Sequence, residues 1–359
     1  MELNVVWIIG NGFDLNLGLR TDYRSFLEKA YFLDRSSERH REQLTDAINK
    51  NLQENEDNHW SDLEILLGEA TTGYQLEDET FYETFEEMQR LFVNYVNSEQ
   101  LRLPNEIPND AITEFWDSIC NFPARLAYVD QETLMLKNSI KASISYNFIN
   151  LNYTRTFDRF LKSASKEYSP FNSRLIGGYS YSDTVEEPVH VHGSIENGKG
   201  LDIIFGVASS SQIKNKLFAE DTSFKEMWIK EEKNYTIYGN SKTEIMRQLL
   251  ANADVFCIYG SSLGDTDNYI WEAIGKRLVT TDNTNLVLFE HALPNRNGQH
   301  ARRYQKQRDS ILNHFKSVSN IANDVFDTIR SRIILSPSKD IFKMELDLSA
   351  NEKYPLPTK

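Results

Sequence analysis

Residues 4–18 read NVVWIIGNGFDLNLG, and this stretch decides the fold. Its apolar run, residues 5–9, is short and continuous, which is typical of a strand buried on both faces of a sheet. The run stops at Gly10-Asn11-Gly12, and a helical pattern begins directly after it. We expect glycine here to permit positive φ and a close approach to a ligand. The amides of the following helix would then face an anion, such as a nucleotide phosphate.

An ordinary strand-to-helix turn, in which glycine serves backbone geometry alone, is the alternative interpretation of this stretch. The dinucleotide fingerprint G-x-G-x-x-G of nicotinamide dehydrogenases is not met, because Leu15 stands at its third glycine and the next glycine is Gly18. The turn therefore predicts a nucleotide site without identifying the nucleotide.

The composition narrows the class of protein. The chain has 359 residues and a net charge of −14, which argues against broad, non-specific binding to nucleic acid. Its apolar runs are shorter than a membrane span or a signal peptide requires. Cys120 and Cys257 form neither a disulfide framework nor a zinc pair, so we expect a cytoplasmic protein that does not bind the membrane.

Apolar periodicity divides the rest of the chain into helices and strands. Residues 21–143 show amphipathic helical patterns with little β signal, so we predict a large helical insertion after the first strand. Further strands are predicted at residues 144–152, 201–205, 254–259 and 285–290, and residues 189–194 are predicted to form a short strand that runs into a turn. Helices between them indicate an α/β fold with a doubly wound parallel sheet. The predicted units are a core of residues 1–20 and 144–300, the insertion, and C-terminal helices with a tail at residues 301–359.

Four predicted strands end in polar or glycine-rich turns. In chain order, these turns are Gly10-Asn11-Gly12, Asn152-Tyr153, His192-Gly193-Ser194 and Gly260-Ser261-Ser262. Ligands of open parallel sheets bind beyond the carboxyl ends of the strands. We therefore expect all four turns to lie on one rim and to line one pocket.

Candidate chemical groups occur in these turns. His192 is suited to proton transfer near neutral pH, and His190 would project from the same strand face, so a metal pair, one catalytic histidine and two structural histidines all stay open. Asn152 offers an amide to a sugar hydroxyl or a water, or holds its own turn. Asp14 stabilises a helix start or binds a ribose hydroxyl, and it disfavours a bare phosphate.

The last turn and the residues after it carry further polar groups. Ser261 and Ser262 offer hydroxyls and amides to a phosphate or a ribose. Asp265 and Asp267 follow closely, and the residue type favours helix capping over ligand binding for both.

The motifs together resemble the AbiH family of bacterial abortive-infection (anti-phage) proteins, from the N-terminus to about Leu288. The segments that carry the resemblance are IIGNGFDLNLGLRTDYRSFL (8–27), LNYT (151–154), HVHGS (190–194), IIFG (203–206) and YGSSLGDTD (259–267). This pattern in turn is similar to the sirtuin-like (SIR2-like) nucleotide-binding core. The resemblance implies a SIR2/Rossmann-like doubly wound sheet that binds NAD as a substrate, with hydrolysis of the nicotinamide–ribose bond.

The sirtuin resemblance also implies residue roles. Asn152 would position ribose or water, His192 would act as general base, and Asp14 is a candidate to stabilise an oxocarbenium-like transition state. Cofactor contacts would come from Gly10, Asn11, Gly12, Phe13, Gly193, Gly260, Ser261 and Ser262. No metal is expected, and the absence of a four-cysteine zinc module argues against protein deacetylation.

Two departures from the sirtuin pattern keep other functions open. Asn11 and Asp14 replace small residues of the sirtuin loop, so the ligand is either NAD or another nucleotide, bound with or without turnover. A non-catalytic nucleotide sensor or adaptor of a defence system is the first alternative. A nuclease is the second, and its only support is the basic stretch at residues 300–308. We expect a homo-oligomer with a phage-derived trigger that these motifs do not identify.

Overall fold

The computed structural model describes residues 2–31, 63–77, 79–134, 141–167, 173–196, 203–239, 241–294 and 301–348. Parts of two predicted units, residues 32–62 of the helical insertion and residues 349–359 of the tail, lie outside the described residues. None of the described helices has the length and apolar character needed to span a membrane.

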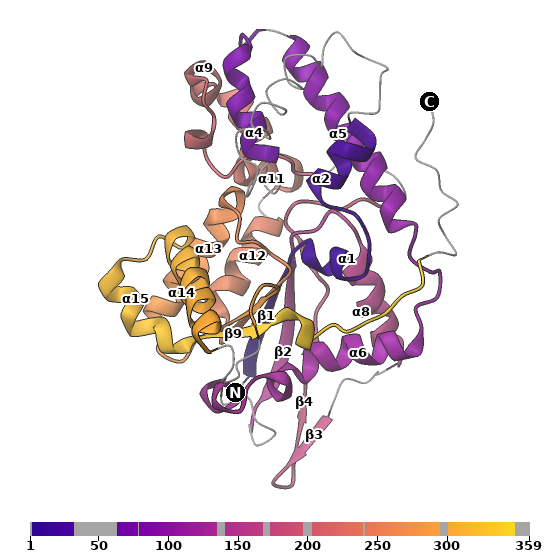
Figure 1. Ribbon diagram of the computed structural model, residues 1–359, viewed down its shortest axis with the longest axis vertical. Helices are drawn as coiled ribbons and strands as arrows, with labels where there is room; N and C mark the ends of the chain where they lie inside the picture. Colours follow the sequence, from indigo (N-terminus) through magenta and orange to yellow (C-terminus); the bar gives the residue numbers. More distant parts are fainter. Residues whose placement is uncertain are drawn as a thin grey trace.

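A parallel sheet forms the centre of the molecule (Figure 1). It runs in the order β5-β2-β1-β7-β8-β9, and β6 also pairs with β2. Its strands are β1 (Glu2–Ile9), β2 (Ser143–Asn150), β5 (Thr184–Val185), β6 (Val189–His190), β7 (Val255–Tyr259), β8 (Asn285–Glu290) and β9 (Ile333–Pro337). Each pairing in this sheet is parallel, which confirms the predicted α/β class.

The buried strand β1 lies between two hydrophobic clusters, and each of its faces belongs to one of them. Val5, Trp7 and Ile9 belong to one cluster, whereas Val6 and Ile8 belong to the other. This alternation follows from the two-residue period of a strand, and burial of both sets explains the continuous apolar run.

Helices cover both faces of the sheet (Figure 1). The first cluster includes residues of α6 (Asn109–Cys120) and α8 (Thr156–Glu167). The second is built with α12 (Ser241–Asn252), α13 (Asn268–Thr280), α14 (Ala301–Val318) and α15 (Asn323–Ile329).

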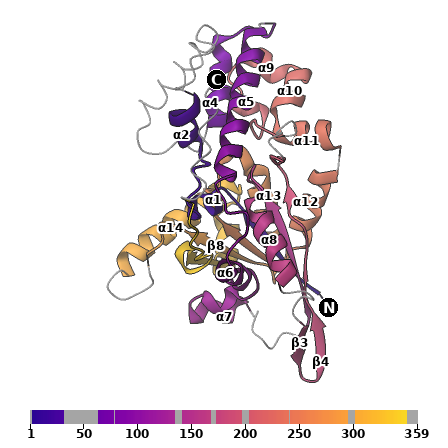
Figure 2. The ribbon, with the colours of Figure 1, turned by 90° about the vertical axis from the view of Figure 1, so that its right-hand side faces the viewer.

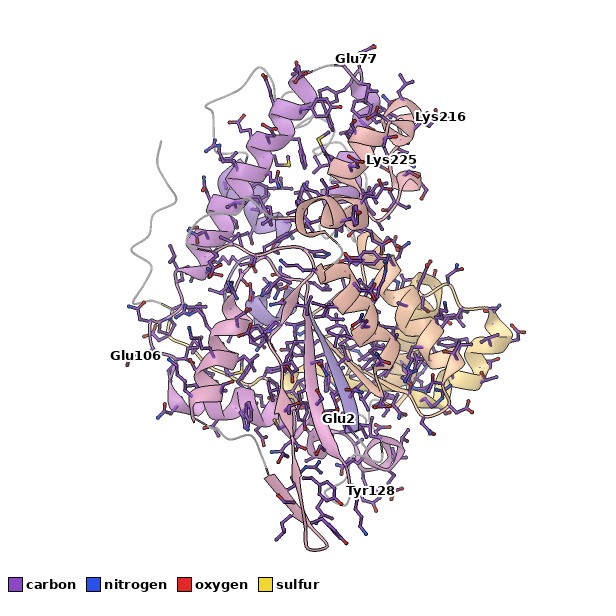
Figure 3. All side chains as sticks on the ribbon, turned by 180° about the vertical axis from the view of Figure 1, so that it is seen from behind. Glu2, Glu77, Glu106, Tyr128, Lys216 and Lys225 are labelled. Atoms are coloured by element: carbon purple, nitrogen blue, oxygen red, sulfur yellow. The ribbon has the colours of Figure 1, made fainter. Side chains whose placement is uncertain are left out.

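A third hydrophobic cluster forms a separate helical lobe above the sheet (Figures 1 and 2). It contains α2 (Tyr23–Phe26), η1 (Leu27–Tyr31), α4 (Leu63–Ala70), α5 (Glu79–Gln100), α9 (Lys216–Glu220) and α10 (Thr222–Trp228). Figure 3 shows Glu77 and Lys216 in this lobe and Glu2, at the start of β1, at the far end. The carboxyl end of β1 therefore points towards the helical lobe.

The described parts of the predicted insertion are helical, as their periodicity indicates, but they pack in two places. Helices α4 and α5 join the helical lobe, together with residues 203–229 from much later in the chain. Helix α6 instead packs on the sheet. The proposed domain boundaries themselves stay a prediction.

Three segments differ from the sequence-based expectations. Residues 203–205 of the predicted strand 201–205 are irregular, because this apolar segment is buried in the helical lobe without a strand ladder. The predicted C-terminal helices and tail also contain β9, which completes the sheet beside β8. A hairpin of β3 (Ser173–Ile176) and β4 (Tyr179–Ser182) lies outside the strands predicted from the sequence.

Candidate functional site

A pocket of about 750 Å³ lies between the carboxyl ends of the strands and the helical lobe. Its lining comes from the turns after β1, β2, β6, β7, β8 and β9 and from α2, α4, α5 and α11 (Lys230–Tyr238). Predicted site residues that border it are Gly10, Asn11, Gly12, Asp14, Asn152, His192, Gly260, Ser261 and Ser262. The rim predicted from the sequence therefore exists, and the helical lobe closes it from above.

One side of the pocket is a glycine wall, formed by Gly10, Gly12 and Gly260. A methyl group on Gly10 would lie 2.6 Å from the carbonyl oxygen of Gly260, and one on Gly12 would lie 2.5 Å from its Cα. Gly260 itself has φ of +72°, a conformation that favours glycine. The ends of β1 and β7 thus pack backbone against backbone, which explains glycine at these positions.

This packing corrects the simple phosphate-cradle hypothesis. The amide of Gly12 donates to the carbonyl of Gly260 at 2.7 Å, and the amide of Phe13 donates to that of Gly10 at 3.0 Å. Gly18, Gly193 and Gly260 have positive φ, whereas Gly10 and Gly12 do not. The following helix, α1 (Gly12–Asn16), is only five residues long. The amides of Gly12 and Phe13 are therefore already bonded and do not offer themselves to a phosphate.

Asp14 borders the pocket with a fully buried side chain. Its Oδ2 accepts hydrogen bonds from Thr154 at 2.6 Å and Thr21 at 3.3 Å. Within the described residues, its Oδ1 has no hydrogen-bond partner. Burial raises the pKa of Asp14 from its usual 3.8 to about 6, because desolvation outweighs the threonine hydrogen bonds. The carboxyl group can therefore exchange a proton close to neutral pH.

Asn152 lies two residues after the end of β2, lines the same pocket as Asp14 and is nearly fully buried. Its Nδ2 donates to the carbonyl of Gly10 at 3.1 Å, which fixes the side chain against the glycine wall. In the part of the chain that the structure describes, its Oδ1 accepts no hydrogen bond. A buried polar atom without a partner is costly, so this oxygen is suited to a ligand hydroxyl or a water.

His192 occupies the turn after β6, and the two ring nitrogens have different surroundings. Nδ1 lies 3.1 Å from the carbonyl oxygen of Leu151, which only accepts, so Nδ1 carries a proton. Nε2 lies 2.9 Å from Oδ1 of Asp267. The geometry of this contact is not that of an aligned hydrogen bond, so it is an electrostatic contact between the imidazole and the carboxylate.

Asp267 leads to a charged cluster that the sequence analysis missed, formed by Glu64, Lys230, Asp267 and His192. Lys230 Nζ lies 2.8 Å from Glu64 Oε2 and 3.0 Å from Asp267 Oδ1. The side chains of Lys230 and Glu64 are only 2% and 3% exposed. Asp267 holds the N-cap position of α13 but makes no capping bond, so the expected capping role is wrong for this residue.

Mutual attraction decides the charges of this cluster. Burial alone would raise the pKa of Asp267, but Lys230 and His192 outweigh it and hold that pKa well below its usual range. Burial alone would lower the pKa of Lys230, yet Asp267 and Glu64 raise it. Lys230 and Asp267 are therefore both ionised at neutral pH.

His190 has partners of its own. Its Nε2 lies 2.9 Å from Oδ2 of Asp158, and its Nδ1 lies 3.3 Å from the carbonyl oxygen of Asn152. His190 thus pairs with Asp158, whereas His192 pairs with Asp267. The contact of His190 with the backbone carbonyl of Asn152 favours a supporting role for His190.

Other predicted site residues lie elsewhere or contribute less. Phe13 is buried among aromatic rings of the first hydrophobic cluster, and neither it nor Gly193 lines the pocket. Ser261 and Ser262 do line it, although Ser261 Oγ also accepts from the amide of Leu263 at 3.1 Å. In the basic stretch, Tyr304 is buried in the second cluster and cannot stack on a base.

Together, the fold and the pocket define an α/β protein with a pocket at the carboxyl ends of parallel strands. The model of the family described as bacteriophage abortive infection AbiH matches residues 6–289. This match spans well over half of the 359 residues, so the chain belongs to the AbiH family and is assigned to phage abortive infection. No curated protein gives a significant match.

Proposed function

We propose that the pocket binds NAD or a related nucleotide and hydrolyses its nicotinamide–ribose bond, as a sirtuin-like site of an abortive-infection protein. One observation carries the proposal. Two buried oxygens, Oδ1 of Asp14 and Oδ1 of Asn152, border the same pocket without a hydrogen-bond partner in the described part of the chain. Such a pair is suited to a ribose and to the positive charge that develops when the glycosidic bond breaks.

The strand order supports a doubly wound, Rossmann-like topology. From β1 the chain moves outward through β2 and β6 on one side and through β7, β8 and β9 on the other. Nucleotides bind in the crevice where such an order reverses, beyond the carboxyl ends of the strands. The pocket lies above this reversal, between the turns that follow β1, β2 and β7.

In the proposed reaction, Asp14, Asn152 and His192 each have one role. The bond between the ribose C1′ and the nicotinamide nitrogen breaks, and nicotinamide leaves with the bonding electrons. Ionised Asp14 stabilises the resulting oxocarbenium-like charge, while Asn152 orients the ribose or the attacking water. The water oxygen bonds to C1′, and its proton passes to Nε2 of His192 and then to solvent, leaving ADP-ribose.

Incubation of the purified protein with NAD⁺, followed by chromatography of nicotinamide and ADP-ribose, tests this function. We expect His192→Ala and Asn152→Ala to lose product. Leu175→Ser serves as control, since Leu175 is 77% exposed in the β3–β4 hairpin, at the end of the molecule opposite the helical lobe (Figure 1). Product formation that survives both site substitutions would overturn the proposal.

Binding without turnover is a second candidate, favoured by the surroundings of His192. Its Nε2 faces Asp267 rather than an open water position. This candidate predicts that NAD⁺ raises the melting temperature of the protein with no product formed. Loss of that shift in Asn152→Ala, together with stable NAD⁺ during long incubation, would favour a sensor over an enzyme.

A further inference from the structure

The walls of the pocket carry more carboxyl groups than positive charges. Among the described residues that line it, the carboxyl groups belong to Asp14, Asp22, Glu64, Asp267 and Glu290. Lys230 is the one lysine or arginine among those same residues. A negative surplus in a pocket attracts cations and repels anions such as phosphate. The charge of the walls therefore limits which part of a nucleotide the pocket can hold.

Lys230 does not offset this surplus for a ligand, because two wall carboxylates already share its charge. Its Nζ lies 2.8 Å from Glu64 Oε2 and 3.0 Å from Asp267 Oδ1. The side chain is nearly fully buried, so the ammonium group lies within the wall. A phosphate that displaced either carboxylate would leave that carboxylate buried without its cation, which is costly. Lys230 is therefore a counter-ion of the wall and not an anchor for phosphate.

Two of the wall carboxyl groups, those of Asp14 and Glu290, have no lysine or arginine partner within the described residues. Asp267 differs from them, because it pairs with Lys230. Burial raises the pKa of Asp14 to about 6. Burial also raises the pKa of Glu290, where it outweighs the attraction of His314. A positively charged ligand would supply the counter-ion that these two carboxyl groups lack.

Unpartnered polar atoms indicate that this surplus belongs to a binding site. Oδ1 of Asp14 and Oδ1 of Asn152 are buried at the pocket, and neither has a hydrogen-bond partner in the part of the chain that the structure describes. The pocket volume of about 750 Å³ corresponds to a width of roughly one Debye length, which is about 10 Å at 0.1 M salt. Salt therefore screens little of the field that the walls exert on a ligand held at these two oxygens.

We infer that the pocket selects its ligand by positive charge, as an N-riboside with a cationic ring such as the pyridinium half of NAD⁺, and that phosphate groups add little to the affinity. The class of ligand rests on the proposed function, but binding does not require turnover. The amides of Gly12 and Phe13 agree with this selection, because backbone carbonyls already accept their hydrogen bonds. Ser261 and Ser262 line the pocket too, but their hydroxyl groups add no positive charge.

Isothermal titration calorimetry with non-hydrolysable analogues separates the effect of the ring charge from that of the phosphates. In carbocyclic NAD⁺ a CH₂ group replaces the ring oxygen of the nicotinamide ribose, so the bond to nicotinamide is stable. Its reduced form has a neutral dihydropyridine ring and the same diphosphate. We expect the oxidised form to bind at least about tenfold more tightly. The carbocyclic analogues of nicotinamide riboside and nicotinamide mononucleotide share the cation and differ by one phosphate, and the riboside should bind at least as tightly.

A matched pair of variants at the two ends of β8 tests whether the wall charges cause this preference. Glu290 is the last residue of the strand and lines the pocket, whereas exposed Asp282 lies three residues before the strand begins. Glu290→Gln and Asp282→Asn each remove one negative charge, and neither residue has a role in the proposed reaction. Only Glu290→Gln should lower the ratio of the oxidised to the reduced affinity, by about threefold.

Equal binding of the oxidised and reduced dinucleotides would overturn the inference and leave NAD binding itself intact. A mononucleotide that binds much more tightly than the riboside would also overturn it, because the pocket would then hold a phosphate. Equal effects of Glu290→Gln and Asp282→Asn would show that the preference does not come from the walls. If none of the four analogues binds, the inference and the proposed function both fail. A charge preference in a protein that leaves NAD⁺ intact would support the inference and contradict only the proposed hydrolysis.

Discussion

The pocket has two walls with different origins, the glycine wall and the charged cluster. The glycine wall joins the ends of two neighbouring strands, and its members touch through backbone atoms. The charged cluster joins side chains from the helical lobe to side chains from the strand ends, across more than two hundred positions of sequence. Both walls join distant positions of the chain, but the glycines lie in turns that end apolar strand runs in the sequence, whereas no sequence pattern marks Glu64 and Lys230 as partners.

The glycine wall determines the shape of the pocket, and the charged cluster determines its electrostatics. Gly10, Gly12 and Gly260 allow the ends of β1 and β7 to approach each other. The carbonyl of Gly10 in this glycine wall accepts the hydrogen bond that holds the Asn152 side chain. The charged cluster places a cation and two carboxylates in the lining of the pocket, on the side of the helical lobe. Substitutions in the first wall should therefore mainly change stability, whereas those in the second should change both stability and proton transfer.

Lys230→Met should have the largest effect on stability. It leaves Glu64 and Asp267 buried without their cation, which should lower the free energy of unfolding by about 4 kcal/mol. Urea denaturation measures this loss. The same substitution at exposed Lys216 should change stability by less than about 0.5 kcal/mol, and equal effects at both positions would contradict the electrostatic interpretation.

Gly260→Ala should come next, because its methyl group would lie 2.7 Å from the amide nitrogen of Phe13 at a positive φ. Overpacking and the left-handed backbone together should cost about 3 kcal/mol in urea denaturation. Gly177 also has positive φ but open space around its Cβ. Gly177→Ala should therefore cost only about 1 kcal/mol, and a similar loss at both glycines would show that packing in the glycine wall is unimportant.

Asp14→Asn should change how stability depends on pH. Because burial raises the pKa of Asp14 to about 6, its contribution to stability is complete below pH 3.8 and is lost as pH rises through 6. Relative to the unmodified protein, the variant should gain about 2–3 kcal/mol between pH 4 and 7. Exposed Asp282 offers a control, since Asp282→Asn should show no such gain. A difference that stays constant with pH would contradict the raised pKa.

Asn152→Ala should have the smallest effect on stability, about 1 kcal/mol, because it removes one hydrogen bond to Gly10. If the pocket hydrolyses NAD⁺, the same change should lower turnover about a hundredfold. Thermal unfolding and product assays on one preparation compare the two effects, with exposed Asn105→Ala as control. A large stability loss without loss of turnover would assign Asn152 to the glycine wall alone.

Much of the fold follows from local patterns. The apolar runs that end at Ile9, Tyr259 and Glu290 predict strands. They form β1, β7 and β8, which lie next to one another in the parallel sheet. Residues 203–205 were misassigned because a short apolar run is equally compatible with burial in an irregular segment. The strand β9 was missed within a polar, helical C-terminal region.

The candidate site was predictable only in part. Asn152 and His192 lie two residues after the ends of β2 and β6, and Asp14 lies five residues after β1, so their convergence follows from the parallel arrangement of the sheet. Asp267 was interpreted as a helix cap, because an aspartate before a helix has that role more often than any other. The signal in the sequence for its true partners is its position five residues after Ser262 of the glycine-rich turn, which does not identify them.

The sequence by itself determined the strands β1, β2, β7 and β8 and the glycine-rich turns that follow β1 and β7. These features depend on short apolar runs and on the glycines that end them. Only the tertiary structure decided that Glu64 and Lys230 lie beside Asp267 and His192, and that Asp14 is buried deeply enough to hold a raised pKa. Charge pairs between distant segments leave no periodic pattern in a sequence, because their attraction depends on distance and burial in space.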